Sequence, residues 1–160
     1  MRNWIEPIDD RAPIDIENKT SKAYLNADDL NRIENNVAYL SEQLNALYYR
    51  HHTSSKTDWD CSGVPRVSDL QRICDNIGAL VAAYRSPDGY REISEIPEKN
   101  LTYEDVNNLE FDLLGIKKII DMLKASFKKS GTFQSGHNTD TSGNKCELNT
   151  KSFLPKLKEE

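Results

Sequence analysis

The chain has 160 residues, of which 37% are hydrophobic and 29% are charged, and its formal net charge is -5. This length suits one domain, and the low apolar share favours long amphipathic helices joined by polar loops. The acidic balance argues against binding a nucleic acid through bulk charge. The start shows no signal peptide, and no run approaches the roughly 18 apolar residues that a membrane span needs.

Residues 1–25 are predicted to form an extended N-terminal segment that carries Trp4 and Pro7. A tryptophan near a proline in an extended segment can lie over a helix seam, while the proline limits the freedom of the chain. For Trp4, exposure as an anchor for a neighbouring subunit is an equally good alternative.

The first predicted helix spans about residues 26–49. Its aliphatic side chains recur at alternating steps of three and four residues from Leu30 to Leu47, which places them along one narrow stripe. Asn26, followed three residues later by Asp29, resembles a capping box, in which two side chains bind each other's backbone N–H groups. The sequence therefore predicts an amphipathic helix with a defined start.

The same spacing returns in a second helix over about residues 67–85 and a third over about 102–129, offset by 40 and 36 residues. "LNRIENN" matches "LQRICDN" position by position, and "VNNLEFD" is a looser third copy. Repeats of this period indicate one supersecondary unit used three times.

The start signals of the later helices differ in clarity. Thr102 with Asp105 again resembles a capping box. For the second helix, Ser68 gives a capping match, whereas Arg66 occupies the position equivalent to Asn26, so its start is open by two residues.

We expect the three helices to pack as a bundle within a domain of residues 26–129, in a mainly α-helical fold. The stripe residues would form its packing seam. The seam consists of Leu30, Ile33, Val37, Leu40, Leu44, Leu47, Leu70, Ile73, Ile77, Leu80, Val106, Leu109, Leu113, Ile116, Ile120 and Leu123.

Several polar and aromatic residues outside the seam are candidate partner contacts, and building or capping the helices is their alternative role. For Trp59 an internal clamp over a seam is the favoured alternative. These candidates are Trp4, Trp59, Arg32, Asn36, Arg72, Asn76 and Phe133.

Long connections separate the helices, at residues 49–66, which contain Trp59 and Pro65, and at residues 85–101, which contain two prolines. Bundle helices are normally joined by about two to eight residues. A segment of about seventeen residues reaches roughly 55 Å when extended, whereas a helix of about twenty residues is about 30 Å long. Such loops allow the helices to run parallel, but antiparallel helices with long loops are equally compatible with their length.

Residues 130–160 are rich in Gly, Ser, Thr and Asn and are predicted to form a flexible or partner-bound C-terminal segment. Residues 132–134 and 146–148 have the composition of short strands, so a short β-hairpin is one reading of this segment. Addition to the sheet edge of a neighbour is another.

No catalytic, cofactor-binding or metal-binding residues are identified. Cys61, Cys74 and Cys146 have no paired spacing, which favours free thiols in a reducing compartment. The histidines are either adjacent or far apart, and the sequence has no Gly-rich phosphate loop and no nucleophile elbow. We therefore expect a non-enzymatic protein without a cofactor.

The order of the motifs resembles that of small minor structural proteins of phages and prophages from Gram-positive bacteria. The resemblance covers roughly residues 3–136 and is carried by "NWIEPIDDR", "AYLNADDLNRIENN", "DWDCSGVPRVSDLQRICDN", "NLTYEDVNNLEFD" and "FKKSGTFQSG". Similar modules with a tryptophan and "LNRIE" occur near the start of longer tail- or baseplate-associated chains. The resemblance implies a component of a virion or tail-like particle, and it supplies no catalytic residues.

From these features we expect a small helical subunit of a tail, baseplate or connector assembly. It would be present in the host cytoplasm during assembly and then in the virion, and it would bind other phage structural proteins. Self-association into a trimer or ring is expected, without nucleic acid and without a membrane span. The alternative is a phage-encoded intracellular binding module that sequesters or regulates a host protein.

Overall fold

The computed structural model describes residues 2–92 and 101–130, with side chains up to residue 127. These residues form a short helix, α1 (Pro13–Glu17), and three long ones, α2 (Ala27–Ala46), α3 (Val67–Ala83) and α4 (Tyr103–Ser130), with no strand in the described ranges. The fold is therefore mainly α, as predicted. The expected β-hairpin lies outside the described residues.

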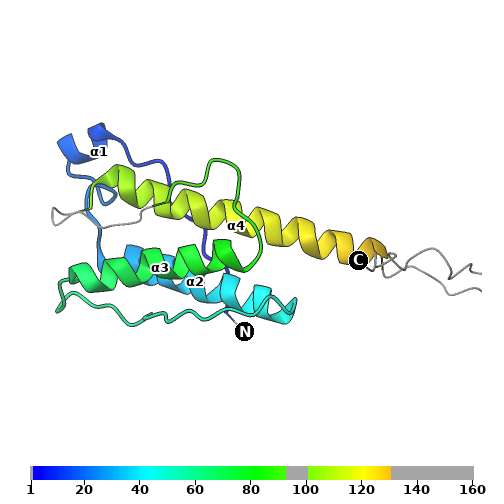
Figure 1. Ribbon diagram of the computed structural model, residues 1–160. Helices are drawn as coiled ribbons and strands as arrows, with labels where there is room; N and C mark the ends of the chain where they lie inside the picture. Colours follow the sequence, from blue (N-terminus) through cyan, green and yellow to red (C-terminus); the bar gives the residue numbers. More distant parts are fainter. Residues whose placement is uncertain (1, 93–100, 131–160) are drawn as a thin grey trace, which may run out of the picture.

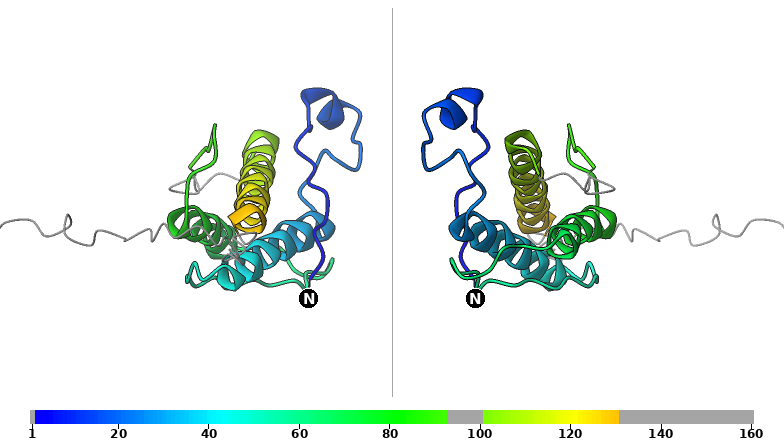
Figure 2. Two further views of the ribbon diagram at one scale, coloured as in Figure 1. Left: turned by 90° about the vertical axis from the view of Figure 1, so that its right-hand side faces the viewer. Right: turned by 90° about the vertical axis from the view of Figure 1, so that its left-hand side faces the viewer.

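The three long helices run parallel around a common axis (Figures 1 and 2). Each of them packs against the other two. The segment between α2 and α3 returns along the bundle as extended chain, so α3 begins beside the start of α2 (Figure 1). The long connections thus serve to bring each new helix back to the same end, which decides between the two open arrangements.

The predicted capping boxes at the starts of α2 and α4 are confirmed. Asn26 Oδ1 accepts the Asp29 N–H at 2.9 Å, and the Asn26 N–H donates to the Asp29 carboxylate at 3.2 Å. Thr102 and Asp105 repeat this exchange at 2.8 and 3.2 Å. In α3 the N-cap residue is Arg66, so the earlier of the two possible starts is the one observed.

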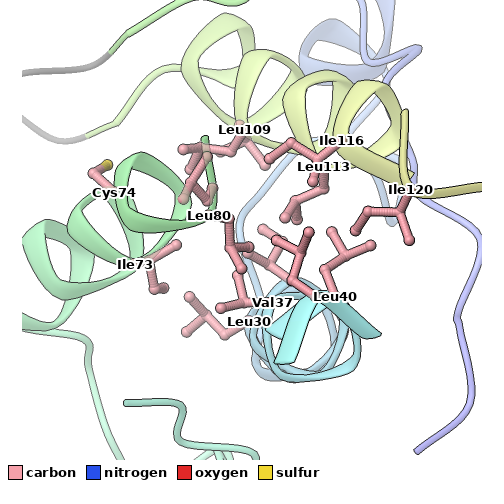
Figure 3. Close-up of a cluster of buried hydrophobic side chains, with 14 of the residues drawn as sticks. Leu30, Val37, Leu40, Ile73, Cys74, Leu80, Leu109, Leu113, Ile116 and Ile120 are labelled. Carbon is pink, nitrogen blue, oxygen red and sulfur yellow. The ribbon is translucent and has the colours of Figure 1, made fainter. Parts of the chain in front are cut away.

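The seam residues form a core on the bundle axis (Figure 3). All of them are buried except Leu47, Leu70 and Leu123, which are partly buried. Burying a large aliphatic side chain contributes about 1.5–3 kcal/mol, so this core is the main stabilising feature. The seam residues of all three helices pack against one another within a single chain, so no second copy is required to bury them.

The N-terminal segment differs from the prediction in two respects. It contains the helix α1, whereas extended chain was expected throughout residues 1–25. Residues 2–12 also belong to the bundle, because they lie along α2 and α4 and are bound by side chains of both helices. The unit that folds together therefore begins well before residue 26.

Candidate functional site

Extended chain fills grooves between the long helices, and polar side chains of the repeat bind its backbone. We call the groove between α2 and α4 the first groove, that between α2 and α3 the second, and that between α3 and α4 the third. Residues 2–12 lie in the first groove, residues 51–60 in the second and residues 90–92 in the third.

In the first groove, two asparagines hold the chain from opposite sides. Asn36 of α2 accepts the Ile5 N–H at 3.0 Å and donates to the Ile5 carbonyl at 2.7 Å. Asn107 of α4 accepts the Arg11 N–H at 3.2 Å and donates to the Arg11 carbonyl at 2.8 Å. The segment is thus fixed at two points that are six residues apart.

The second groove uses the same device. Asn76 of α3 accepts the Ser54 N–H at 3.0 Å and donates to the Ser54 carbonyl at 2.7 Å. Asn31 of α2 accepts the Trp59 N–H at 2.8 Å and donates to the Trp59 carbonyl at 2.9 Å. A carboxamide offers one donor and one acceptor side by side, so it pairs with a residue's backbone as a neighbouring strand would.

The grooves are related by the sequence repeat. Asn36 and Asn76 occupy the same repeat position, and Asn31 and Asn107 share another. In the first groove, α2 supplies Asn36 and α4 supplies Asn107. In the second groove, α3 supplies the equivalent Asn76 and α2 supplies the equivalent Asn31. The chain is therefore a pseudo-threefold bundle in which every unit contributes one helix and the extended segment before it.

Buried ion pairs lock α2 to α4 in the first groove. Glu110 and Asp29 each bind both Arg11 and Arg32, at nitrogen–oxygen distances from 2.5 to 3.1 Å. All four side chains are buried, and their formal charges cancel. Burial lowers the pKa of Arg32, but the hydrogen bonds to Glu110 and Asp29 outweigh this effect, so the pKa stands above its ordinary value. Each charged side chain of the cluster has a partner of opposite charge, although Arg11 Nε is buried without a hydrogen-bond acceptor.

The second groove contains the equivalent pair, Glu34 and Arg72. Glu34 is fully buried and binds the Arg72 guanidinium through both oxygens, at 2.6 and 2.7 Å. It also accepts the Lys56 N–H at 2.7 Å and the Trp59 indole N–H at 3.3 Å. One carboxylate thus joins two helices and the segment between them.

The third groove departs from this pattern. Cys74 stands where the other units have Glu34 and Glu110, and burial raises the pKa of its thiol to about 11. Asp112 stands where the others have Asn36 and Asn76, and its carboxylate accepts the Arg91 N–H at 3.2 Å. Both changes replace a fully bonded buried group by one with less bonding capacity at neutral pH.

The structure gives most of the candidate partner contacts a role within the chain. Trp59, Arg32, Asn36 and Asn76 are buried inside the bundle, and Arg72 pairs with the buried Glu34. The preferred reading of Trp59 as an internal clamp agrees with its position in the core.

The other two candidates lie elsewhere. Trp4 is partly buried against Tyr39, with a ring separation of 5.8 Å, and therefore also packs internally. Phe133 lies outside the described residues.

Sequence reasoning missed Glu34, Glu110 and Arg11 as structural residues. Acidic side chains are rarely fully buried, so the two glutamates gave no indication of a place in the core. The available signal was their shared repeat position, since Glu34 and Glu110 each directly follow a seam residue.

The described part of the chain contains no group of three or more His, Cys, Asp or Glu side chains placed to hold a metal ion. His51 is engaged with the Ser41 hydroxyl and the Tyr49 carbonyl, both at 2.9 Å. None of the described helices has the length and apolar character required to cross a membrane.

No family model, curated protein or solved structure matches the chain. Its role is therefore argued from its own residues.

Proposed function

We propose that the chain is a non-enzymatic structural protein of a phage particle, a small helical subunit of its tail, baseplate or connector. The observation that carries the proposal is the use of the repeated polar residues. Asn31, Arg32, Glu34 and Asn36 all lie within "LNRIENN", and each bonds internally to another helix or to a groove segment.

This use gives an architectural role to the motif through which the sequence resembles phage structural proteins. A motif that binds extended chain between parallel helices specifies an architecture and leaves its side chains no free group for catalysis. The asparagine–backbone hydrogen bonds and the buried ion pairs should make the bundle rigid, because a helix or a groove segment cannot move without breaking them. Rigidity of this kind suits a subunit that must hold a fixed position in an assembly.

The test is the composition of purified particles. Particles from a host that produces the phage encoding this chain should contain it at a fixed copy number, measured by quantitative mass spectrometry. Deleting its gene should give particles with a defective tail or baseplate in electron micrographs. Absence from the particles, together with normal assembly of the deletion mutant, would overturn the proposal.

A pull-down from host lysate addresses the alternative role as an intracellular binding module. The proposed function predicts that the chain captures other particle proteins when the phage is being assembled. Capture of a single host protein in uninfected lysate, combined with absence from particles, would favour the binding module.

A further inference from the structure

Helix α4 has a second apolar face, on the side opposite to the seam. At 100° per residue, Phe111, Leu114, Lys118, Ile119 and Met122 lie on one side of the helix, and the seam residues lie on the other. We call these five residues the α4 outer face. Met122 is 64% exposed, and Phe111 is 38% exposed with the Arg91 guanidinium 5.6 Å from its ring centre. Leu114 and Ile119 are partly buried, so the bundle leaves this face partly uncovered.

The pseudo-threefold arrangement shows that this face is particular to α4. The positions equivalent to Phe111 are Asn35 in α2 and Asp75 in α3, and those equivalent to Leu114 are Ala38 and Gly78. The bundle therefore folds with polar or small residues at these positions. Apolar side chains there are not required by the core, which points to a contact outside the chain.

A pocket of about 270 Å³ lies on this face, beside the loop that follows α3. Pro87 covers Gly115 so closely that an added Cβ at Gly115 would lie 2.8 Å from the proline ring. The next residue, Asp88, is fully exposed and has only a distant contact of 3.9 Å with Arg85. Lys118, on the helix side of the pocket, is exposed and has no ion partner among the described residues.

These groups complement one another across a two-fold axis. If the α4 helices of two copies cross antiparallel, one register sets Phe111 of each copy opposite Met122 of the other. It brings Lys118 opposite Gly115 of the other copy, beside which Asp88 lies. Apolar contacts and both charge pairs are then satisfied by one arrangement, as an isologous interface requires.

We propose that two copies of the chain form a dimer through the α4 outer face, with Lys118 of each copy paired with Asp88 of the other. The dimer goes beyond the proposed function and replaces the seam as the reason for self-association. It is measured on the purified chain, so its failure would leave the particle test unaffected.

Sedimentation equilibrium of the full chain tests the dimer. The wild type should show a reversible monomer–dimer equilibrium, and Met122→Asp should shift it to monomer. Val64→Asp, at an 88% exposed apolar residue on another part of the surface, is the matched control and should dimerise as the wild type does. A wild-type chain that stays monomeric at every attainable concentration overturns the proposal.

Charge reversal identifies the interface. Lys118→Asp or Asp88→Lys alone should weaken the dimer about tenfold, because each breaks two equivalent pairs and creates two repulsions. The double variant, or a mixture of the two single variants, should restore the wild-type affinity, whereas Lys19→Asp should leave it unchanged. A dimer that is insensitive to Met122→Asp and to both single reversals must use another surface, and that result also refutes the proposal.

Discussion

Replacing Asp112 by Asn should stabilise the protein at neutral and alkaline pH. Asp112 is 1% exposed, and burial raises the pKa of its carboxyl from 3.8 to about 6, although the Arg91 N–H and guanidinium act in the opposite direction. The two equivalent positions carry asparagines, Asn36 and Asn76, that bind backbone with a donor and an acceptor. Asparagine should therefore suit this buried position better than an ionised aspartate does.

The magnitude follows from the pKa. A shift of about two pH units corresponds to about 3 kcal/mol of penalty on the ionised folded form. Because Asp112→Asn removes this penalty and keeps the acceptor for Arg91, it should raise the free energy of unfolding by about 1–3 kcal/mol at pH 8.

The sign of the pH dependence is fixed by the raised pKa. Between about pH 4 and pH 6 the folded state binds the Asp112 proton more tightly than the unfolded state does, so this carboxyl's contribution to stability falls as the pH rises. The gain from Asp112→Asn should therefore be small near pH 4, grow through pH 6 and stay constant above it.

Urea denaturation of wild type and variant from pH 4 to pH 8, followed by circular dichroism, measures this difference directly. The other titrating groups are common to both proteins and cancel. Asn36→Asp is the matched control, and it should destabilise the protein increasingly as the pH rises. A difference for Asp112→Asn that does not change with pH, or a loss of stability at pH 8, would refute the reasoning.

The remaining predictions concern the core and the ion pairs. Ile77→Asp puts an unpaired charge at a site that is 2% exposed, so it should cost more than about 4 kcal/mol and abolish helical circular dichroism, and retained cooperative unfolding near the wild-type midpoint would contradict this. Arg72→Ala leaves the buried Glu34 without its cation and should cost about 2–3 kcal/mol in urea denaturation, discounted because Arg72 is partly exposed; an unchanged midpoint would show that the pair is dispensable. In a Cys146→Ser background at pH 8, the exposed Cys61 should react rapidly with a thiol reagent and Cys74 only on unfolding, and equal rates would contradict the burial of Cys74.

The three long helices and the starts of α2 and α4 were predictable because they rest on local rules. The stripe spacing and the Asn26–Asp29 exchange involve residues within one or two turns, so the sequence alone defines them. The equivalence of residues such as Asn36 and Asn76 also follows from the sequence, because aligning the repeats does not require knowing which helices are neighbours.

The direction of the helices and the groove contacts were not predictable in this way. The length of the connection at residues 49–66 permits both parallel and antiparallel packing, and only the tertiary contacts of the segment decide. Asn36 and Glu110 bind residues 31 and 102 positions away in the chain, so no local pattern links them to Ile5 and Ile8. The burial of Asn36 and Glu110 depends on the parallel packing of the helices, which the sequence pattern does not determine.

The parallel course of the helices is tested most directly by distances between spin labels in the full chain with its native cysteines replaced. A label pair at Asp28 and Ser68, at the starts of α2 and α3, should give a backbone separation close to the 8–10 Å axis spacing of packed helices, lengthened by the labels. A pair at Asn45 and Ser68 should be about 30 Å apart, the length of α2. Reversal of this order, with Asn45 near Ser68 and Asp28 far from it, would contradict the parallel bundle and the grooves that depend on it.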